Sequence, residues 1–291
     1  MSLTKEQIID SVSRTLVMAG SSFRDDKINA YNRAIEKETN PQAKWVMETI
    51  LANADSAKKN SSPLCDDSGI PHIVLEIGDD VAVTGAMLEA VKKGVAQGLR
   101  KLPGRPMGIC GDDIQRIDQS GGLDTDPAGV LTAPFLIRHT KENAFRVHIM
   151  MFGGGPAIRA KTYRVFHKHS ADTVFDEIIS WGKEAVAQLG CSPCTLAVGI
   201  GRSHFEASSL MVEALVEGTY DRQSIHEKRI TEAVNESKTG ALGLHGDTSV
   251  LATFMKVGPQ RASGVRVVCM RPCCCFEPRI ATVDLLNGCI Y

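Results

Sequence analysis

Three short cysteine-bearing segments, far apart in the chain, constrain the fold of this sequence more than any other feature. They read SPLCDDSG at residues 62–69, GCSPC at residues 190–194 and RPCCCFEPR at residues 271–279. Because each contains proline, none fits a regular helix or a central strand, and each is predicted to be a loop. Thiolates are soft ligands for iron or zinc. Three remote cysteine loops therefore predict a fold that brings them to one shared centre.

The first of these segments places a thiol beside two carboxylates. Cys65 is followed by Asp66 and Asp67, between a proline and a glycine that both favour a turn. Carboxylates orient hard groups such as water or an alcohol, so the segment offers both sides of a metal-assisted reaction. A pair of aspartates on its own more often caps a turn, but the adjacent thiol favours a functional site.

Composition limits the class of protein. The 291 residues are 43% hydrophobic with a formal net charge of -1, which gives no attraction to polyanions, so no nucleic-acid partner is expected. No window approaches about 18 consecutive apolar residues, and the N-terminus lacks an export signal, so we expect no membrane span and a cytoplasmic location. The nine cysteines are then expected to be reduced thiols, some of them holding metal.

Hydrophobic periodicity predicts helices over the first 60 residues. Thr4 and Gln7 form a capping-box pattern ahead of the first helix. Asn40, followed by proline, opens the third helix, which is expected to end near residue 60. We expect residues 1–60 to be an N-terminal helical segment and residues 61–291 to be an α/β catalytic domain that forms one continuous structural unit with it.

Beyond residue 60, strands and helices interleave. Strands are expected at residues 72–77, 131–137, 145–152, 195–200, 249–255 and 264–269, with a last run near residue 280. Helices are expected at residues 83–102, 174–189 and 221–234, and after the capping box that starts at residue 203. This order predicts an α/β fold, or a mixed α+β one, in which the helical segment precedes a layered mixed sheet with flanking helices.

Two arginines in predicted loops are candidates for binding a carboxylate. Arg105 stands in the turn-rich stretch of residues 103–130, a length that is usually functional or mobile in a compact domain. Arg279 follows the third cysteine loop. Either guanidinium can clamp a carboxylate with two hydrogen bonds, or remain a solvated surface charge.

Glycine-rich segments supply further candidates. The glycines of residues 153–155 permit close approach of the backbone to a ligand. Residues 199–201 resemble part of a dinucleotide fingerprint, but the third glycine and the acidic partner are missing, so no NAD site is expected. Among the histidines, His245 in a glycine turn and His204 at a helix start are the candidates for a function.

The cysteine spacing by itself leaves three possibilities open. Cys191 and Cys194, with the cysteines of residues 273–275, offer a structural zinc site, which needs four tetrahedral ligands. One cysteine from each loop offers instead an iron-sulfur cluster, in which one iron without a protein ligand polarises a substrate oxygen. The third possibility is that no metal is bound.

Taken together, these segments resemble the α subunit of the class I iron-sulfur hydro-lyases, the oxygen-sensitive fumarases and L(+)-tartrate dehydratases, over most of the chain. Residues 63–69 are similar to the family's Pro-x-Cys-Gln-Asp-Thr-Gly signature, and residues 153–155 to its triple glycine. Residues 191–201 are similar to its Cys-Pro-Pro strand-loop, and residues 239–250 to its Gly-Leu-Gly-Gly-x-Thr-Thr/Ser-Val turn. The set is specific, although each piece alone is not.

The resemblance implies roles for particular residues. It implies a 4Fe-4S cluster held by Cys65, Cys191 and Cys275, the last because the family's third ligand precedes an arginine by four positions. Cys273 and Cys274 remain alternatives. It implies that Asp67 and Asp66 are a catalytic pair of carboxylates. It also implies a set of substrate-binding residues: Arg105, Gly154, Gly155, Arg279 and His245.

The sequence also departs from the family pattern. Asp66 replaces the family's glutamine and adds negative charge beside the site, which bears on the acid accepted. A His-Pro step that the family places before the last cysteine strand is Gly258-Pro259 here, so a substrate-contacting histidine is absent. In the family a lysine follows the triple glycine. Lys161 matches it only weakly, because its distance from the glycines in the sequence differs from the family's.

The implied activity is the reversible hydration and dehydration of a small hydroxy-dicarboxylate of the fumarate/malate or tartrate type, with the open cluster iron as Lewis acid. In the family the base that removes a proton next to a carboxylate comes from a β subunit or β domain, for which 291 residues leave no room. We therefore expect a separate β subunit as partner, in an α2β2 assembly or with an α homodimer. Two alternatives remain, a zinc-binding structural or regulatory subunit without catalysis and a cluster-binding homologue that has lost activity.

Overall fold

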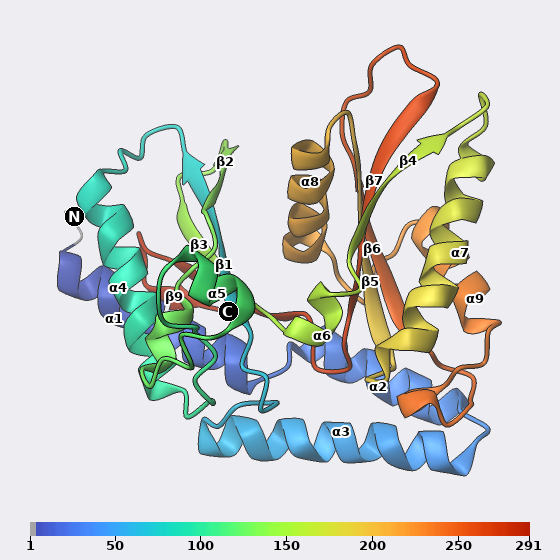
Figure 1. Cartoon of the computed structure of the whole chain (residues 1–291), viewed down its shortest axis with the longest axis horizontal. Coiled ribbons are helices and arrows are strands. Elements are labelled where there is room, and N and C mark those ends of the chain that lie inside the picture. The colour runs from blue at the N-terminus through green and yellow to red at the C-terminus, as the bar shows by residue number, and fades with distance from the viewer. Residues whose placement is uncertain (1–3) are drawn as a thin grey trace. The chain divides into compact units, whose positions relative to one another are not determined.

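The computed structural model of the chain describes residues 4–291 and has the mixed α/β fold expected from the sequence (Figure 1). Its residues cluster into two compact units. The first unit contains the residues up to Phe23, Ala54–Gly153 and Arg279–Tyr291, and the second contains Arg24–Asn53 and Gly154–Pro278. The expected division of the chain at residue 60 stays a prediction. None of the helices in residues 4–291 is long and apolar enough to cross a membrane.

The first unit is built on a five-stranded mixed sheet with the strand order β2-β1-β3-β8-β9. Strands β1 and β2 are parallel, and the other neighbours are antiparallel. The elements of this unit are α1 (Lys5–Ser21), β1 (Ile70–Gly78), α4 (Gly85–Lys101), α5 (Asp113–Asp118), the 3-10 helix η1 (Pro127–Val130), β2 (Leu136–Thr140), β3 (Phe145–Phe152), β8 (Arg279–Asp284) and β9 (Cys289–Ile290). Helix α3 (Pro41–Asn60) contains residues of both units.

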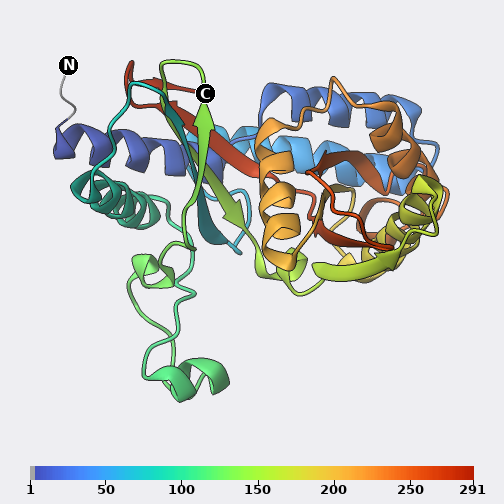
Figure 2. The ribbon, with the colours of Figure 1, turned by 90° about the horizontal axis from the view of Figure 1, so that it is seen from above.

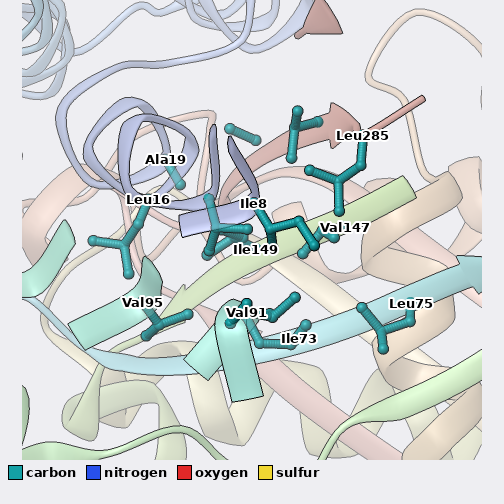
Figure 3. Close-up of a cluster of buried hydrophobic side chains, with 14 of the residues drawn as sticks. Ile8, Leu16, Ala19, Ile73, Leu75, Val91, Val95, Val147, Ile149 and Leu285 are labelled. Atoms are coloured by element: carbon teal, nitrogen blue, oxygen red, sulfur yellow. The ribbon is translucent and has the colours of Figure 1, made fainter. Parts of the chain in front are cut away.

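Helices α1 and α4 cover one face of this sheet and enclose the core of the first unit (Figure 3). Side chains such as Ile8 and Leu16 of α1 pack in one buried cluster with Val91 of α4 and Ile149 of β3. Burying an apolar side chain of this size stabilises the fold by about 1.5–3 kcal/mol. The helical period of α1 and the strand period of β3 therefore meet in the same core.

Local capping fixes where the N-terminal helices begin. The hydroxyl of Thr4 accepts a hydrogen bond from the backbone N–H of Gln7, and the Gln7 side chain accepts one from the backbone N–H of Thr4 at 2.9 Å. This is the capping box that the sequence predicts. Asn40 accepts from the backbone N–H of Gln42 at 2.9 Å and opens α3, which ends at Asn60 as expected.

The second unit is built on a four-stranded mixed sheet with the strand order β4-β7-β5-β6, in which β5 and β6 are parallel. Helix α8 lies on one face of the sheet, and α7 and α9 lie on the other (Figure 1). The elements of this unit are α2 (Asp25–Lys37), α6 (Gly154–Ala157), β4 (Lys161–Phe166), α7 (Ala171–Leu189), β5 (Cys194–Gly201), α8 (His204–Glu217), α9 (Ile225–Asn235), the 3-10 helix η2 (Ala241–Gly243), β6 (Val250–Val257) and β7 (Val265–Cys273).

The two glycines that resemble a dinucleotide fingerprint serve helix packing. A Cβ atom at Gly199 would lie 2.0 Å from the carbonyl oxygen of Ala207 and 2.4 Å from the backbone nitrogen of Met211, both on α8. A Cβ at Gly201 would lie 2.8 Å from the Ala207 nitrogen. Glycine at these positions lets α8 pack directly on the backbone of β5.

Two strands differ from the sequence prediction. β2 begins at Leu136 rather than at residue 131, because Pro134 has no N–H to donate to a neighbouring strand. The polar turn at residues 140–143 does not make a hairpin, because β1 lies between β2 and β3 and pairs with both. β4 was not predicted, because it is an edge strand in which Val165 is the one buried residue, so it lacks the apolar alternation of a half-buried strand.

Between α4 and β2 the chain makes a long excursion away from the sheet of the first unit (Figure 2). An isolated bridge between Ile109 and Leu123 joins its two sides, and α5 buries none of its side chains. The sequence predicts a loop here, and the structure adds the short helices α5 and η1. Arg105 lies at the beginning of this excursion.

Candidate active site

The first cysteine segment follows α3 and forms a bend anchored by Leu64. The Leu64 side chain is buried, and its backbone N–H donates to the carbonyl of Gly20 at 2.9 Å. The anchor leaves Cys65 half-buried and the carboxylate of Asp66 exposed. The Cys65 Sγ lies 3.4 Å from Asp66 Oδ1. The local turn therefore holds the predicted thiol and carboxylate side by side.

Asp66 links the cysteine turn to the start of the excursion. Its carboxylate accepts a hydrogen bond from the backbone N–H of Asp67 at 2.9 Å and lies 3.4 Å from the Arg105 Nη1. The hydrogen bond from the Cys65 thiol, followed by the Asp67 N–H and the charge of Arg105, lowers the pKa of the Asp66 carboxyl. Both Asp66 and Arg105 remain exposed, so the pair is open to a ligand from solvent.

Arg279 lies in a different environment from the one the sequence predicts. It is the first residue of β8 rather than a loop residue, and it is only 2% exposed. Its Nη1 donates to the carbonyl of Asp67 at 2.6 Å, and its Nε donates to the carbonyl of Met151 at 3.2 Å. The loop prediction was wrong because the β-rich run begins directly after Pro278, one residue earlier than the apolar pattern indicated. In this position the guanidinium fixes the backbone of the cysteine turn.

Gly69 is required by this arrangement. Its φ angle is +87°, and a Cβ there would lie 2.7 Å from Arg279 Nη2 and 2.9 Å from the backbone of Phe152. Only glycine adopts such a φ without strain and leaves this space open. Gly69, the last residue of the predicted motif, therefore leaves space for the Arg279 side chain.

A small hollow lies next to the cysteine turn. It has a volume of about 10 Å³ and is lined in part by Ser68, Gly104 and Arg105. The Ser68 hydroxyl is buried and has no hydrogen-bond partner in residues 4–291. Ser68 packs so closely that a Cβ on Gly104 would lie 1.8 Å from its Oγ. The sequence reasoning did not single out Ser68, although it stands inside the predicted motif.

In the second unit the other two cysteine loops are joined. The backbone N–H of Cys275 donates to the carbonyl of Cys191 at 2.8 Å. Cys191 is exposed, whereas Cys275 is buried. A hydrogen bond with the Cys274 thiol, then burial, raises the pKa of the Cys275 thiol, and the charge of Cys191 acts in the same direction. The structure therefore brings together two of the three predicted cysteine ligands within this unit.

Cys194 and Cys273 are parts of the sheet of the second unit. Cys194 is the first residue of β5, Cys273 is the last residue of β7, and both side chains are fully buried. Burial is the largest cause that raises the pKa of each thiol. Both residues are paired with neighbouring strands, so their thiols act as small apolar side chains within the sheet, whereas Cys275 lies in the loop that follows β7.

Lys27 and Tyr31 of α2 contact the third cysteine loop, which the sequence reasoning did not predict. The Lys27 Nζ donates to the carbonyl of Glu277 at 2.8 Å, and the Tyr31 hydroxyl donates to the carbonyl of Cys275 at 2.7 Å. Burial lowers the pKa of Lys27 to about 8, opposed most strongly by Cys274 and then Cys275. Lys27 stands four residues before Tyr31, on the buried side of α2. A lysine among the buried positions of a helix is rare, and this is the sequence signal that could have identified Lys27 as a functional or structural residue.

A second buried ion pair belongs to the same loop. The Arg271 Nη2 donates to Glu277 Oε2 at 2.9 Å, and both side chains are almost entirely shielded from solvent. Buried charges of this kind persist when they are paired and hydrogen-bonded. The loop that carries Cys275 is therefore fixed by an ion pair as well as by backbone hydrogen bonds.

The predicted glycine-rich turn adjoins the second cysteine loop. The Ser192 hydroxyl donates to the carbonyl of Gly240 at 2.6 Å, and the backbone N–H of Leu242 donates to the carbonyl of Ser192 at 3.1 Å. His245 is exposed, with a φ angle of +62°. Its carbonyl accepts from the side-chain amide of Asn40 at 2.9 Å. The turn thus presents the His245 side chain to solvent from a backbone held on both sides.

Gly154 and Gly155 begin the short helix α6. The carbonyl of Gly155 accepts a hydrogen bond from Arg159 Nη1 at 2.9 Å, and a Cβ on Gly155 would meet no atom within 4 Å. The Gly155 backbone is therefore open on its Cα side to a ligand. Two other candidates have different surroundings: Lys161 pairs with Glu184 at 3.0 Å, and His204 is the exposed first residue of α8.

The side chains of the cysteine loops offer sulfur ligands rather than a preformed metal site. Within residues 4–291 no group of three or more His, Cys, Asp or Glu side chains is arranged to hold a metal ion. The structure describes the nine cysteines as thiols rather than disulfides. Thiols carried by two loops that a backbone hydrogen bond joins are chemically suited to a thiolate-bound centre, because thiolates are soft ligands for iron and zinc. The residues of the second unit fit such a centre in chemical type.

Comparison with known proteins agrees with this arrangement of motifs. The chain is 25% identical over 287 residues to a Methanocaldococcus jannaschii protein named "Putative L(+)-tartrate dehydratase subunit alpha", covering 94% of this chain and 96% of that one. It is 20% identical over 275 residues to the L(+)-tartrate dehydratase subunit alpha of Escherichia coli K12 and to that of Shigella boydii, covering 92% of this chain and 88% of each. Residues 9–284 match the fumarate hydratase (Fumerase) family. The resemblance seen in the sequence is confirmed, and the chain belongs to this family of hydro-lyases.

Proposed function

We propose that this chain is the α subunit of a cytoplasmic iron-sulfur hydro-lyase that adds water to, or removes it from, a small hydroxy-dicarboxylate of the fumarate/malate or tartrate type. The observation that carries the proposal is the hydrogen bond from the Cys275 backbone N–H to the Cys191 carbonyl, at 2.8 Å. It joins two cysteine loops, and the buried Lys27 contacts the second of them. The proposal is supported by relatives that bear the name of an L(+)-tartrate dehydratase α subunit along nearly the whole chain.

In this proposal Cys65, Cys191 and Cys275 hold a 4Fe-4S cluster. When bound, such a cluster supplies an iron without a protein ligand, which acts as a Lewis acid toward a substrate hydroxyl. Cys274 is the alternative third ligand, because it neighbours Cys275 and is less buried than Cys273. The place of Cys273 within β7, where it pairs with Thr195 of β5, argues against it as a loop ligand.

The residues of the first unit are proposed to bind and orient the substrate. The exposed guanidinium of Arg105 binds one carboxylate, because its planar fork matches the two carboxylate oxygens. Asp67 orients the substrate hydroxyl, and Asp66 holds Arg105 in place across 3.4 Å. Arg279 acts through Asp67, because it donates to the carbonyl of that residue at 2.6 Å.

The residues of the second unit are proposed to complete the binding of the substrate. The open Cα side of Gly155 and the neighbouring Gly154 allow a carboxylate to approach the backbone. His245 extends into solvent from its fixed turn and can donate a hydrogen bond to an oxygen of the substrate. The base that removes the proton is proposed to come from a separate β subunit, in an α2β2 assembly or on an α homodimer.

The test is anaerobic purification of the chain with its β partner, followed by iron and sulfide analysis. We expect broad visible absorbance, and we expect Cys65→Ser to lose most of the iron because one of three thiolate ligands is removed. Cys110→Ser is the matched control, since Cys110 is exposed in the excursion and has no role in the proposal. A colourless wild-type protein with tightly bound zinc, or unchanged iron in Cys65→Ser, would overturn the assignment.

A further inference from the structure

A cavity of about 410 Å³ opens in the second unit, at the end of β5 away from the cysteine loops. Ile200 and Val257, which line it, are register partners near the carboxyl ends of the parallel strands β5 and β6. Cys194 begins β5 at the opposite end, and the eight residues of this strand, at about 3.3 Å each, separate its two ends by roughly 20 Å. In open α/β sheets, ligands bind beyond the carboxyl ends of the strands. The cavity is therefore a candidate binding site apart from the cysteines.

Much of the cavity surface is apolar. Val174 and Phe175 of α7 and Ile200 of β5 are buried and belong to the core of the second unit. Val257, which also lines the cavity, is 55% exposed and so extends this apolar surface toward solvent. Ligand pockets are typically about 300–1,000 Å³ in volume, with apolar walls and a few fixed polar groups. The volume and the lining therefore suit the apolar body of a small molecule.

Arg266 of β7 places a cation at the edge of this apolar surface. The side chains of Val268 and Met270 belong to the buried core, and Arg266 is the next residue of the same alternation along β7. Arg266 is half-buried and lines the cavity. Arginine is rare at positions in register with a core unless its charge is paired. This arginine therefore marks a place where an anion is expected.

The Arg266 guanidinium is fixed on one side and open on the other. Its Nη1 donates to the carbonyls of Ser263 and Val265, each at 3.0 Å. His167 Nε2 donates to the same Ser263 carbonyl at 2.8 Å. In residues 4–291 neither the Nε nor the Nη2 of Arg266 has a hydrogen-bond or ion-pair partner. The edge formed by these two nitrogens matches the two oxygens of a carboxylate.

The groups around the cavity favour an anion over a cation. Two histidines, His167 and His169, line it, and within the described chain none of the lining residues is an aspartate or a glutamate. The acidic residues near the start of α7, Asp172 and Asp176, are both paired with Arg229 of α9. The ring of His169 lies edge-on to that of His167, with the centroids 5.4 Å apart, and can donate a second hydrogen bond to an anion.

We propose that this cavity binds a monocarboxylate with an apolar chain. The carboxylate pairs with the Nε and Nη2 of Arg266, and the chain lies on the apolar surface that runs from Phe175 to Val257. A second carboxylate would lie against apolar side chains without a partner, so the hydroxy-dicarboxylate of the proposed reaction is a poor fit. The inference does not depend on an iron-sulfur cluster, because no cysteine lines the cavity in the described residues.

The experiment measures the binding of octanoate to the full chain by isothermal titration calorimetry. We expect one site per chain. Arg266→Gln is expected to weaken octanoate binding by about tenfold or more, because charge-assisted hydrogen bonds to the carboxylate are lost. Arg261→Gln is the matched control, since Arg261 is an exposed arginine in the same connection between β6 and β7 and does not line the cavity. It is expected to leave the affinity unchanged.

Matched ligands separate the charge from the apolar contact. Octan-1-ol has the chain without the charge, and acetate has the charge without the chain. Each is expected to bind about tenfold or more weakly than octanoate. Val257→Asp replaces an exposed apolar lining residue by a negative charge and is also expected to weaken octanoate binding. Because Val257 is exposed, this variant keeps the test decisive if Arg266→Gln fails to fold.

The outcomes separate this inference from the proposed function. Arg105→Gln is expected to leave octanoate binding unchanged, and loss of binding in that variant would place octanoate in the proposed substrate site and overturn the inference. No binding by the wild type, equal affinities for octanoate and octan-1-ol, or equal losses in Arg266→Gln and Arg261→Gln would also overturn it. Loss of binding when the β subunit is added would do the same, since the cavity would then be a subunit contact. None of these results bears on the iron and sulfide content that tests the proposed function.

Discussion

At Gly104 the chain leaves no room for a side chain. A Cβ there would lie 1.8 Å from the Oγ and 2.8 Å from the Cβ of Ser68, which is itself buried in the cysteine turn. The next residue is Arg105, the proposed carboxylate-binding group. Any side chain at position 104 must therefore push the excursion, and with it Arg105, away from Asp66.

We expect Gly104→Ala to raise KM for the dicarboxylate by about tenfold or more, because displacement of a substrate-binding group by about 1 Å can cost a factor of this size. Steady-state kinetics of the α–β complex measures it. Gly85→Ala is the control, since a Cβ on Gly85 meets no atom within 4 Å. The double variant Gly104→Ala, Ser68→Gly removes the clash and is expected to recover KM. Equal KM values for both single variants would contradict this account.

At the scale of elements, the sheet of the first unit carries a polar cluster on four neighbouring strands. Glu76 of β1 accepts from Arg138 of β2 at 2.8 Å and from Arg146 of β3 at 2.5 Å. His148 of β3 is buried, and its Nδ1 lies 2.8 Å from the hydroxyl of Thr282 on β8. Burial, followed by the charge of Arg138, lowers the pKa of His148 to about 4. The imidazole is therefore neutral in the folded protein near neutral pH.

This cluster predicts a pH-dependent stability. Unfolded His148 binds a proton below about pH 6.5, whereas the folded protein protonates it only near pH 4. The stability due to this site is complete above about pH 6.5 and is lost as the pH falls toward 4, by up to about 3 kcal/mol. His148→Gln is expected to remove this pH dependence of stability. The measurement is the difference in Tm between wild type and variant, which is expected to change between pH 6.5 and pH 4. A difference that stays constant with pH, or the same change in the exposed-site control His204→Gln, would refute it.

At the scale of the whole molecule, each of the two units carries part of the proposed active site. Cys65, Asp67 and Arg105 belong to the first unit, whereas Cys191 and Cys275 belong to the second. Each unit draws on segments from distant parts of the chain, so neither corresponds to one continuous stretch of sequence.

We expect the isolated chain to lack dehydratase activity and the α–β complex to have it, because the proposed proton-removing base is supplied by the β subunit. The measurement is the absorbance of the fumarate formed from malate and of the oxaloacetate formed from tartrate, using the reconstituted chain alone and then with increasing β subunit. The iron content of the chain alone serves as the control for cluster loading. Full turnover by the isolated, loaded chain would show that the base lies within these 291 residues.

Local patterns were sufficient to predict the elements whose boundaries are fixed by neighbours in sequence. The box at Thr4 and Gln7, the Asn40 cap and the fully buried β5 all depend on side chains within a few residues or on a continuous apolar run. β4 escaped prediction because an edge strand depends on its partner β7 rather than on its own apolar content.

The sequence alone determined the family, the mixed α/β class and the residue types of the candidate site, because the motif around Cys65 and the cysteine loops are local features of composition and spacing. Tertiary structure alone decided that Arg279 holds the Asp67 carbonyl and that Lys27 lies buried at the third cysteine loop. The physical reason is that a pair separated by more than 200 positions, such as Lys27 and Glu277, leaves no periodic trace in either segment. Burial and charge compensation are properties of the packed chain, and they exist only once these segments meet.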